Sequence, residues 1–153
     1  MSSIDWRWYG WQDLDRDTLY ALLRARQDVF VIEQNCPYPE LDGKDAAAWH
    51  LIGTDAGTAG PILASARVFA PGDYYAEAAI GRVLTAAAGR GRGLGRAVMV
   101  ECHRFVAERF GEPAVRLNGQ AYLKAFYEGL GYRVVHGPYD EDGIPHYEML
   151  KDR

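Results

Sequence analysis

The chain has 153 residues, of which 48% are hydrophobic and 25% are charged, and its formal net charge is −4. This is the size and composition of one globular domain, so we expect a single domain over residues 1–153. The acidic balance argues against binding to nucleic acid through overall charge. No segment approaches the roughly 18 apolar residues of a membrane span, and the N-terminus lacks a signal-peptide pattern. We therefore expect a cytoplasmic protein with neither nucleic acid nor membrane as partner.

The two cysteines and four histidines give no sign of a disulfide or a metal site. Cys36 precedes a proline in a polar stretch, whereas Cys102 lies on the apolar side of a predicted helix. Two distant thiols without an export signal indicate reduced cysteines. No histidine has a second metal ligand at helical spacing, so no metal is expected.

The first half of the chain is predicted to begin with a strand and a helix. Residues 4–9 alternate and are rich in aromatics, which is typical of a half-buried strand. Apolar residues recur at helical spacing from Leu14 to Val29, which predicts a helix over about 15–29. The tryptophans of this region are either packed strand residues or a contact surface, such as that of a homodimer; they are Trp6, Trp8 and Trp11.

A loop and a hairpin follow. Pro37 and Pro39 break regular structure in a loop that continues to Gly43. A strand begins at 50–53, a turn rich in glycine covers 56–61, and 62–69 forms the returning strand.

The second half is predicted to alternate strands and helices. In chain order these are a strand at 78–85, a glycine-rich loop, a helix at 94–110, a strand at 114–118, a helix at 123–130, a strand at 132–135, a turn at Asp142-Gly143 and a strand at 146–151. The complete order, β α β β β α β α β β, predicts a mixed α/β domain with one sheet.

The glycine-rich loop is the most informative segment. It reads Gly-Arg-Gly-Arg-Gly-Leu-Gly-Arg over residues 89–96, between a strand and a long helix. Glycines allow a close backbone approach, and the helix start offers unpaired amides and a positive dipole end. This combination predicts a phosphate or pyrophosphate site, with arginines at its rim.

The spacing of the glycines distinguishes among phosphate ligands. A dinucleotide fingerprint needs glycines at relative positions 1, 3 and 6, and no starting glycine provides them; a Gly-Lys-Ser/Thr loop is also absent. The segment does match Arg-x-x-Gly-x-Gly, at Arg90, Gly93 and Gly95. It therefore resembles the CoA-pyrophosphate signature of the GNAT acetyltransferases. The alternatives are a flexible segment that touches nucleic acid, or a plain loop.

The resemblance covers roughly residues 80–135. The strand at 80–85 looks like the fourth strand of the family, and residues 126–132 resemble its tyrosine-bearing helix with a Gly-aromatic exit. Where the family usually has Asp-Pro before the loop, this chain has Ala86-Ala87. Residues 29–38 and 140–146 look like the ElaA-like branch of the family.

The resemblance implies a GNAT fold and acetyl-CoA as the acyl donor. That fold is a mixed, mostly antiparallel sheet whose fourth and fifth strands splay apart to hold CoA, with helices on both faces. Gln120 stands where relatives often carry a cofactor-contacting asparagine. The expected cofactor-binding residues are Val83, Thr85, Arg90, Gly91, Arg92, Gly93, Gly95, Arg96, Gln120 and Tyr127.

The same resemblance assigns chemical roles. Tyr127 is the expected acid that protonates the leaving thiolate. The base is chosen from the sequence itself: Glu33 is the first choice, because it follows the apolar run 29–32 and precedes a loop expected to border the acceptor side, with His146 and His50 as alternatives. The residues expected to bind the acceptor are Glu33, Gln34 and His146. Acidic loops at 33–45 and 140–142 either face a cationic acceptor or are merely solvated.

The sequence therefore predicts acetyl transfer to a primary amine of a small molecule or a protein, by direct attack in a ternary complex. The alternative is a CoA-binding module without turnover, acting as a sensor or interaction protein. Transfer of a longer acyl group, or transfer to a hydroxyl, is also left open.

Overall fold

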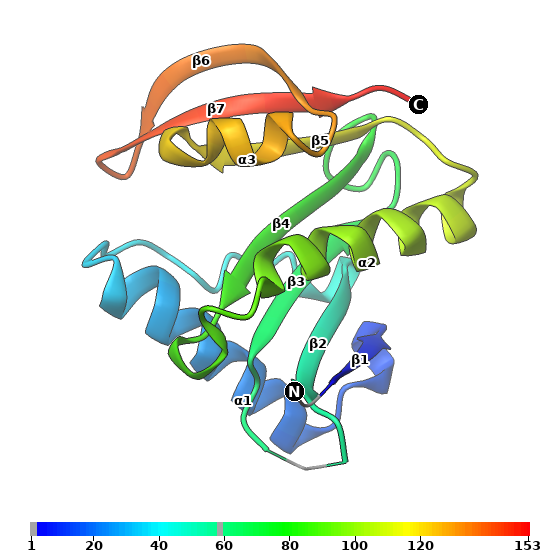
Figure 1. The fold of residues 1–153 in the computed structure, drawn as a ribbon, viewed down its shortest axis with the longest axis vertical. Helices are drawn as coiled ribbons and strands as arrows, with labels where there is room; N and C mark the ends of the chain where they lie inside the picture. Colours follow the sequence, from blue (N-terminus) through cyan, green and yellow to red (C-terminus); the bar gives the residue numbers. More distant parts are fainter. Residues whose placement is uncertain (1–2, 58–59) are drawn as a thin grey trace.

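A computed structural model describes residues 3–57 and 60–153. Thr58 and Ala59, which belong to the expected 56–61 turn, lie outside the described residues. The chain forms one seven-stranded sheet in the order β1-β2-β3-β4-β5-β7-β6. Neighbouring strands are antiparallel except β4 and β5, which run parallel. The sheet and its helices are drawn in Figure 1.

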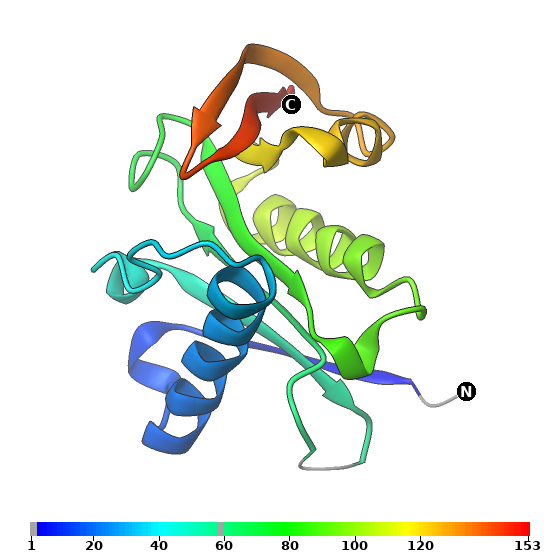
Figure 2. The same ribbon diagram turned by 90° about the vertical axis from the view of Figure 1, so that its left-hand side faces the viewer.

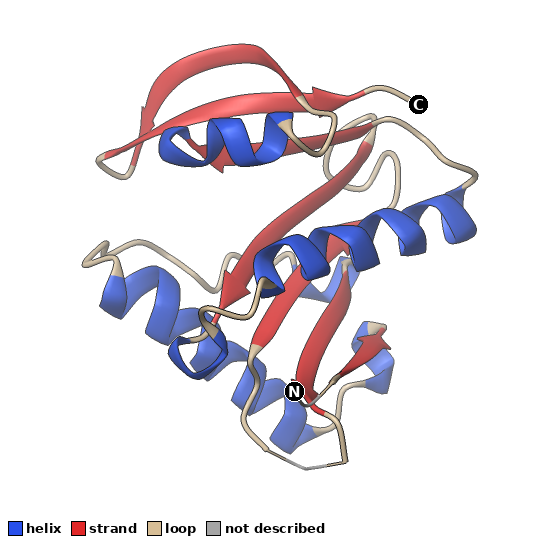
Figure 3. Ribbon diagram, viewed as in Figure 1, coloured by secondary structure: helices blue, strands red, loops and turns tan. Residues whose placement is uncertain are grey.

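The observed elements follow the expected order with shifted boundaries. They are β1 (Ile4–Tyr9), α1 (Arg16–Arg26), β2 (Trp49–Asp55), β3 (Ala64–Phe69), β4 (Ala78–Thr85), α2 (Leu94–Phe110), β5 (Val115–Gln120), α3 (Lys124–Glu128), β6 (Arg133–Glu141) and β7 (Ile144–Lys151). Helices cover both faces of the sheet, as Figure 3 shows by colour.

The first helix extends beyond the predicted end. Asp15 caps α1 by accepting a hydrogen bond from the Thr18 backbone N–H at 2.7 Å. After Arg26 the chain does not stop but widens into a π-helical segment, Gln27–Glu33. Such segments are rare and often lie at functional sites. Glu33 therefore ends this segment instead of opening a loop.

The central strand β3 is buried on both faces. Ala64, Ala66 and Val68 belong to the main hydrophobic core beneath α2. The alternate residues of β3 point to the other face, which α1 and the loop after it cover; they include Arg67. Figure 2 shows α1 and α2 on opposite faces of the strands. Helix α2 ends at Gly111, which adopts a left-handed conformation.

Two of the three N-terminal tryptophans, Trp6 and Trp8, pack as strand residues, whereas Trp11 lies in the short 3-10 helix Trp11–Asp13 after β1. The Trp8 ring stacks on Phe105 of α2, with centroids 3.9 Å apart. The Trp6 ring lies directly over Gly53 of β2, where an added Cβ would stand 2.5 Å from a ring carbon. Packing against the core explains both residues, and a homodimer stays a prediction.

The β1–β4 half of the sheet and the β5–β7–β6 half are joined by only two residue pairs. β4 and β5 pair at Ala78↔Val115 and Ala79↔Arg116, both at the start of the strands. Beyond these pairs the strands diverge, and Figure 1 shows the opening between β4 and the β5–β7–β6 half. The expected splay of the fourth and fifth strands is therefore confirmed.

The last two strands form a longer hairpin than the sequence indicates. β6 and β7 extend to the pair Glu141↔Ile144, and the turn is Asp142-Gly143, as predicted. Both turn residues have positive φ, 53° and 83°, as a type I′ turn requires. The extension places His146 inside β7 and opposite Gln120, the last residue of β5.

Candidate active site

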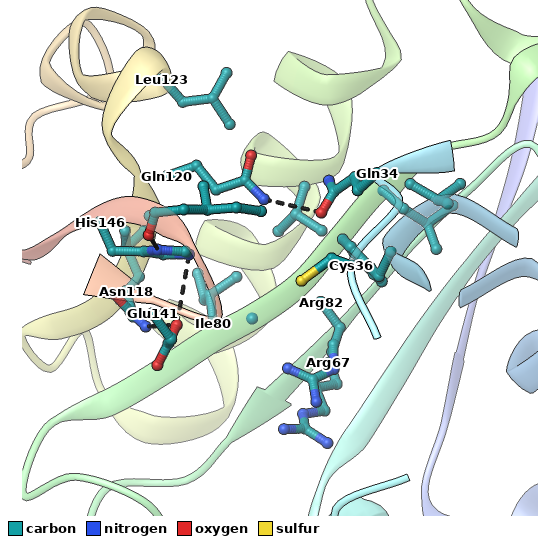
Figure 4. A pocket seen from close by; sticks show the side chains of 18 of the residues that line it. Gln34, Cys36, Arg67, Ile80, Arg82, Asn118, Gln120, Leu123, Glu141 and His146 are labelled. Atoms are coloured by element: carbon teal, nitrogen blue, oxygen red, sulfur yellow. Dashed lines mark hydrogen bonds and ion pairs between the residues drawn. The ribbon is translucent and has the colours of Figure 1, made fainter. Parts of the chain in front are cut away.

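A pocket of about 740 Å³ lies where β4 and β5 diverge. Both halves of the sheet, the π-helical segment and the loop after it contribute to its lining. Figure 4 looks into this pocket. Of the residues expected from the sequence, it brings together Glu33, Gln34, Val83, Thr85, Arg90, Gly95, Gln120, Tyr127 and His146. Gly91, Arg92, Gly93 and Arg96 are not among its lining residues.

A β-bulge in β4 shapes one wall of the pocket. Ser65 pairs with Leu84 and Arg67 pairs with Gly81, so Ala66 faces two residues of β4, Arg82 and Val83. Arg82 adopts a positive φ of 50°, which is uncommon for a residue with a side chain. The bulge leaves part of β4 outside the ladder at the level where the strands splay, and bulges often lie next to active sites.

The glycine-rich loop has the geometry of an anion site. Gly91 and Gly93 have positive φ values of 81° and 70°, and an added Cβ would meet nothing within 4 Å at either position. Gly93 begins α2 without a side-chain cap, and the first turn has no acidic residue. The amides of that turn lack intrahelical partners, so they suit the phosphates of CoA.

The other two glycines of the loop have different roles. A Cβ on Gly89 would stand 2.9 Å from the carbonyl oxygen of Leu63, so Gly89 permits close packing of the chain. Gly95 lines the pocket, and its nearest obstacle would be a Phe126 ring atom 3.9 Å away. The chain turns before the loop without the family's Asp-Pro, because the Gly89 N–H donates to the Ala86 carbonyl at 2.8 Å.

Tyr127 is a buried phenol at the pocket wall. Tyr127 is 7% exposed. Its ring packs on those of Phe126 and Tyr132, with ring centroids 5.1 and 5.9 Å apart, respectively. Among the described residues, none accepts or donates a hydrogen bond at its hydroxyl. Burial raises the pKa of Tyr127 to about 12, so the phenol keeps its proton at neutral pH.

Two polar contacts join the π-helical segment to other walls. The Arg90 guanidinium donates to the Glu33 carboxylate and, at 3.3 Å, to the Thr85 carbonyl. Gln120 donates to Gln34 at 3.1 Å, a contact visible in Figure 4. Both partners of the ion pair are substantially exposed, at 50% for the Arg90 side chain and 38% for that of Glu33.

A second polar group lies on the β5–β7–β6 side. His146 Nδ1 is 2.7 Å from the Ile144 carbonyl oxygen, and His146 Nε2 is 3.4 Å from Glu141 Oε2. Asn118 donates to the same Glu141 oxygen at 2.7 Å, and the Tyr139 hydroxyl donates to Asn118. The pocket lining includes Asn118, Glu141 and His146.

The first acidic loop does not present free negative charge to the pocket. Arg26 pairs with Glu40 and Asp45, Arg67 with Asp42 and Asp45, and Arg82 with Glu40 and Asp42. Figure 4 shows two of these arginines, Arg67 and Arg82, below β4. Burial raises the pKa of Asp42, but hydrogen bonds from Arg67 and from the Lys44 N–H outweigh it and hold the pKa below its ordinary value. Three cations and three anions compensate one another in this arginine–carboxylate cluster.

The remaining cysteines and histidines have structural settings. Cys36 lines the pocket and its Sγ donates to the Asp142 carbonyl at 3.4 Å, which ties the hairpin tip to the loop. Cys102 is fully buried, and burial raises the pKa of its thiol. His50 contacts the Asp45 carbonyl at 3.0 Å, and His103 contacts the Tyr132 hydroxyl at 2.8 Å.

Neither a metal-binding cluster nor a membrane-crossing helix occurs in the described part of the chain. Residues 3–57 and 60–153 contain no group of three or more His, Cys, Asp or Glu side chains that could hold a metal ion. Within the same ranges, no helix has the length and apolar character needed to cross a membrane.

Comparison with known proteins identifies the family. A model of the acetyltransferase (GNAT) domain matches residues 60–153. The chain is 36% identical over 147 residues to a UPF0039 protein of Synechocystis, with 96% of this chain and 94% of the relative covered. The chain therefore belongs to the GNAT family, whose members are acyltransferases that use acyl-CoA as the acyl donor.

Within the family, the chain is similar to ElaA in both sequence and structure. Protein ElaA of Escherichia coli is 35% identical over 151 residues, with 97% of both chains covered. The crystal structure of that protein matches with a TM-score of 0.89 at 34% identity and covers 98% of this chain and 100% of that one. An acyl-CoA N-acyltransferase from Pseudomonas aeruginosa matches with a TM-score of 0.91 at 38% identity and covers 97% and 99%. The expected ElaA-like branch is confirmed.

Several pocket residues are not predicted by the sequence. Arg67 and Arg82 appear there only as parts of strands, Asn118 has no expected role, and Glu141 is expected only as one residue of the acidic loop 140–142. A charged residue inside an apolar strand is the available signal for both arginines, because a buried charge requires a partner. Nothing in the sequence places Asn118 beside Glu141.

Proposed function

We propose that this protein transfers the acetyl group of acetyl-CoA to a primary amine by direct attack in a ternary complex. The observation that carries the proposal is a pocket between splayed strands that runs up to Arg90 and Gly95 of the glycine loop. A buried tyrosine whose hydroxyl has no hydrogen-bond partner among the described residues lines the same pocket. Phosphates, thioester and amine then each have a place that matches their chemistry.

The residues that would hold the acyl donor fit its parts. The uncapped start of α2 and the open glycines suit the pyrophosphate. The edge of β4 that faces away from β3, from about Val83 to Thr85, suits the amides of the pantetheine arm, since β5 pairs with β4 only at residues 78 and 79 and leaves backbone groups beyond them without a strand neighbour on that side. A backbone N–H near Val83 is the proposed donor to the thioester oxygen. Arg92, which pairs with Asp55 at 2.9 Å, and Arg96 would act on the phosphates from outside the pocket.

Tyr127 is the proposed acid. A phenol with a pKa of about 12 is protonated at neutral pH and can give its proton to a departing thiolate. Its position beside Gly119 supports this role, because an added Cβ there would stand 2.8 Å from the ring. The absence of a side chain at this position therefore lets the ring occupy its place on β5.

The amine must lose a proton before it attacks. An alkylamine with a pKa near 10.4 is about one part in 2,500 neutral at pH 7, which is a penalty of roughly 4.6 kcal/mol. A base in the pocket would reduce this penalty. Glu33 and His146 both line the pocket and are candidates that the sequence predicts; His50 is buried and does not line it.

The proposal is tested by thermal unfolding with acetyl-CoA, using NAD and ATP as matched anionic controls. A ligand at about 100 times its Kd stabilises the fold by roughly 2.7 kcal/mol, so Tm rises clearly. We expect the shift with acetyl-CoA alone, followed by thiol release on addition of primary amines. Equal shifts with all three ligands would contradict a CoA-specific glycine loop. A shift without thiol release for any amine or alcohol would support a CoA-binding module without turnover.

A further inference from the structure

The wall formed by β5, β6 and β7 holds His146, one of the two candidate bases, and a carboxylate to which no step above assigns a role. Figure 4 shows His146, Glu141 and Asn118 side by side, across the pocket from Cys36 and Arg82. His146 is 8% exposed, whereas His136 on β6 is exposed. Among the described residues, His146 is the one histidine that lines the pocket.

The hydrogen bond at Nδ1 determines the tautomer of His146. The Ile144 carbonyl oxygen, 2.7 Å from Nδ1, can only accept a hydrogen bond. Nδ1 therefore carries the hydrogen, and in the neutral imidazole the lone pair lies on Nε2. That nitrogen is the one that faces Glu141.

Nε2 and the Glu141 carboxylate are neighbouring hydrogen-bond acceptors, and both residues line the pocket. The two atoms are 3.4 Å apart, and neither carries a hydrogen when the imidazole is neutral. Asn118 and Tyr139 hold the carboxylate in position through successive hydrogen bonds. A cationic N–H group satisfies both acceptors at once, and the carboxylate charge is not compensated by an arginine as it is in the arginine–carboxylate cluster.

On the basis of the proposed function, we propose that Glu141 and His146 form the subsite for the acceptor's ammonium group and that His146 is the base. The ammonium loses one proton to Nε2, and the neutral nitrogen forms a C–N bond with the thioester carbonyl carbon. The C–S bond breaks, its electron pair stays on sulfur, and sulfur takes the proton of Tyr127. The second proton of the nitrogen returns to the Tyr127 oxygen, and His146 gives its proton to water. The substrate class is therefore a cationic primary amine.

The other charged side chains that line the pocket, apart from Asp142, are in ion pairs with one another or with the rest of the arginine–carboxylate cluster. Glu33 is held by Arg90, and Arg82 belongs to the arginine–carboxylate cluster. The titratable and charged groups that contact the imidazole or line the pocket with it are Glu141, Tyr139, Asp142, Glu33, Asp42, Arg67, Arg82, Arg90, Cys36, Tyr38, Tyr74, Tyr75, Tyr122 and Tyr127. Of these, Glu141 is the one in ion-pair distance of Nε2.

The kinetic test compares His146→Gln with His136→Gln, a matched change at an exposed histidine on the neighbouring strand. The test uses n-butylamine, tyramine and spermidine as acceptors, with acetyl-CoA as donor. We expect His146→Gln to lower kcat by roughly 10²- to 10⁴-fold, while acetyl-CoA still raises Tm. Glu141→Gln should raise KM for the amine up to about fivefold. Equal kcat in the two histidine variants would overturn the proposal.

A measurement without turnover keeps the inference separate from the proposed function. In ¹⁵N NMR of the wild-type protein, neutral His146 should carry its hydrogen on Nδ1. n-Butylammonium should shift the His146 signals and leave those of His136 unchanged, and in Glu141→Gln the same shift should require up to about fivefold more butylammonium. A hydrogen on Nε2 of neutral His146, or His146 signals that do not respond to butylammonium, would contradict the proposal even if acetyl-CoA binds. A wild type that releases no thiol but shows this response would overturn the proposed function and leave the ammonium subsite standing.

Discussion

The role proposed for Tyr127 depends on the surroundings of its side chain. The ring is held by Phe126, Tyr132 and the bare backbone of Gly119, while its hydroxyl has no partner among the described residues. Burial disfavours the phenolate and so raises the pKa. The same tyrosine in solution would differ little in protonation at pH 7, but it would not be placed at a fixed point on the pocket wall.

Replacing Tyr127 with phenylalanine should separate catalysis from binding. We expect kcat to fall by roughly 10²- to 10⁴-fold, because the leaving thiolate loses its proton donor, while the Kd for CoA changes little. Steady-state kinetics and calorimetry with CoA measure the two quantities. Tyr122→Phe is the comparison, since Tyr122 also lines the pocket but is 75% exposed. If kcat fell further in Tyr122→Phe than in Tyr127→Phe, the general acid would be Tyr122.

At the scale of elements, the π-helical segment and the glycine loop are directly connected. The Arg90–Glu33 ion pair joins the end of one to the start of the other. A phosphate bound at the loop would compete with Glu33 for Arg90, because both are anions. With the donor bound as proposed, this exposed ion pair would link donor binding to the proposed acceptor side of the pocket.

Glu33→Gln tests this connection. With its competitor neutralised, Arg90 should bind CoA up to about fivefold more tightly, the range expected for an exposed ion pair. Calorimetric titration with CoA gives the affinity, and Glu101→Gln on α2 is the matched control, since Glu101 pairs with Arg104 away from the pocket. Weaker CoA binding would contradict the competition. If Glu33→Gln turned over at least roughly 100-fold more slowly while His146→Gln kept full activity, the base would be Glu33.

At the scale of the whole molecule, the arginine–carboxylate cluster connects α1, the following loop, β3 and β4. Arg26 is 1% exposed and Asp45 8%, so these charges are removed from water. Such a pair contributes little over an apolar substitute, but loss of one partner leaves a buried charge uncompensated. The cluster therefore makes the position of the acceptor-side loop depend on both helix and sheet.

Asp45→Asn should cost about 3–5 kcal/mol in the free energy of unfolding, because Arg26 and Arg67 would share too little negative charge. Urea denaturation at pH 7 measures the change. The matched control is Asp5→Asn, whose ion pair with Arg7 is exposed and should contribute at most about 1 kcal/mol. Equal costs in the two variants would contradict a buried cluster.

The same cluster predicts the sign of the acid dependence. Burial raises the pKa of Asp45, but its hydrogen bond and charge interaction with Arg26 outweigh burial, and the pKa falls below the ordinary 3.8. A carboxylate with a lowered pKa stabilises the fold above its unfolded pKa, and this contribution is lost as the pH drops through the folded pKa. The wild type should therefore lose stability below about pH 4 more steeply than Asp45→Asn, as urea titrations across pH 7 to 3 would show.

The features that depend on residues close together in the chain could be predicted from the sequence alone. The glycine loop and the helix after it lie within a few residues of one another, so spacing alone indicated a phosphate site and excluded two other nucleotide motifs. The Asp142-Gly143 turn followed from the same kind of local rule, because few residues tolerate two successive positive φ angles. The tyrosine helix was recognised from contiguous residues, and so was the family.

The tertiary structure alone decided what the acceptor side contains. From the sequence, the acidic loop carries negative charge without partners. In the structure, Arg26, Arg67 and Arg82 from three other elements form ion pairs with its carboxylates. The meeting of Glu141 with His146 depended on the register of β6 and β7, and a shift of one residue would turn every side chain to the other face. Local spacing cannot encode such contacts, because they form only when distant segments pack into one sheet.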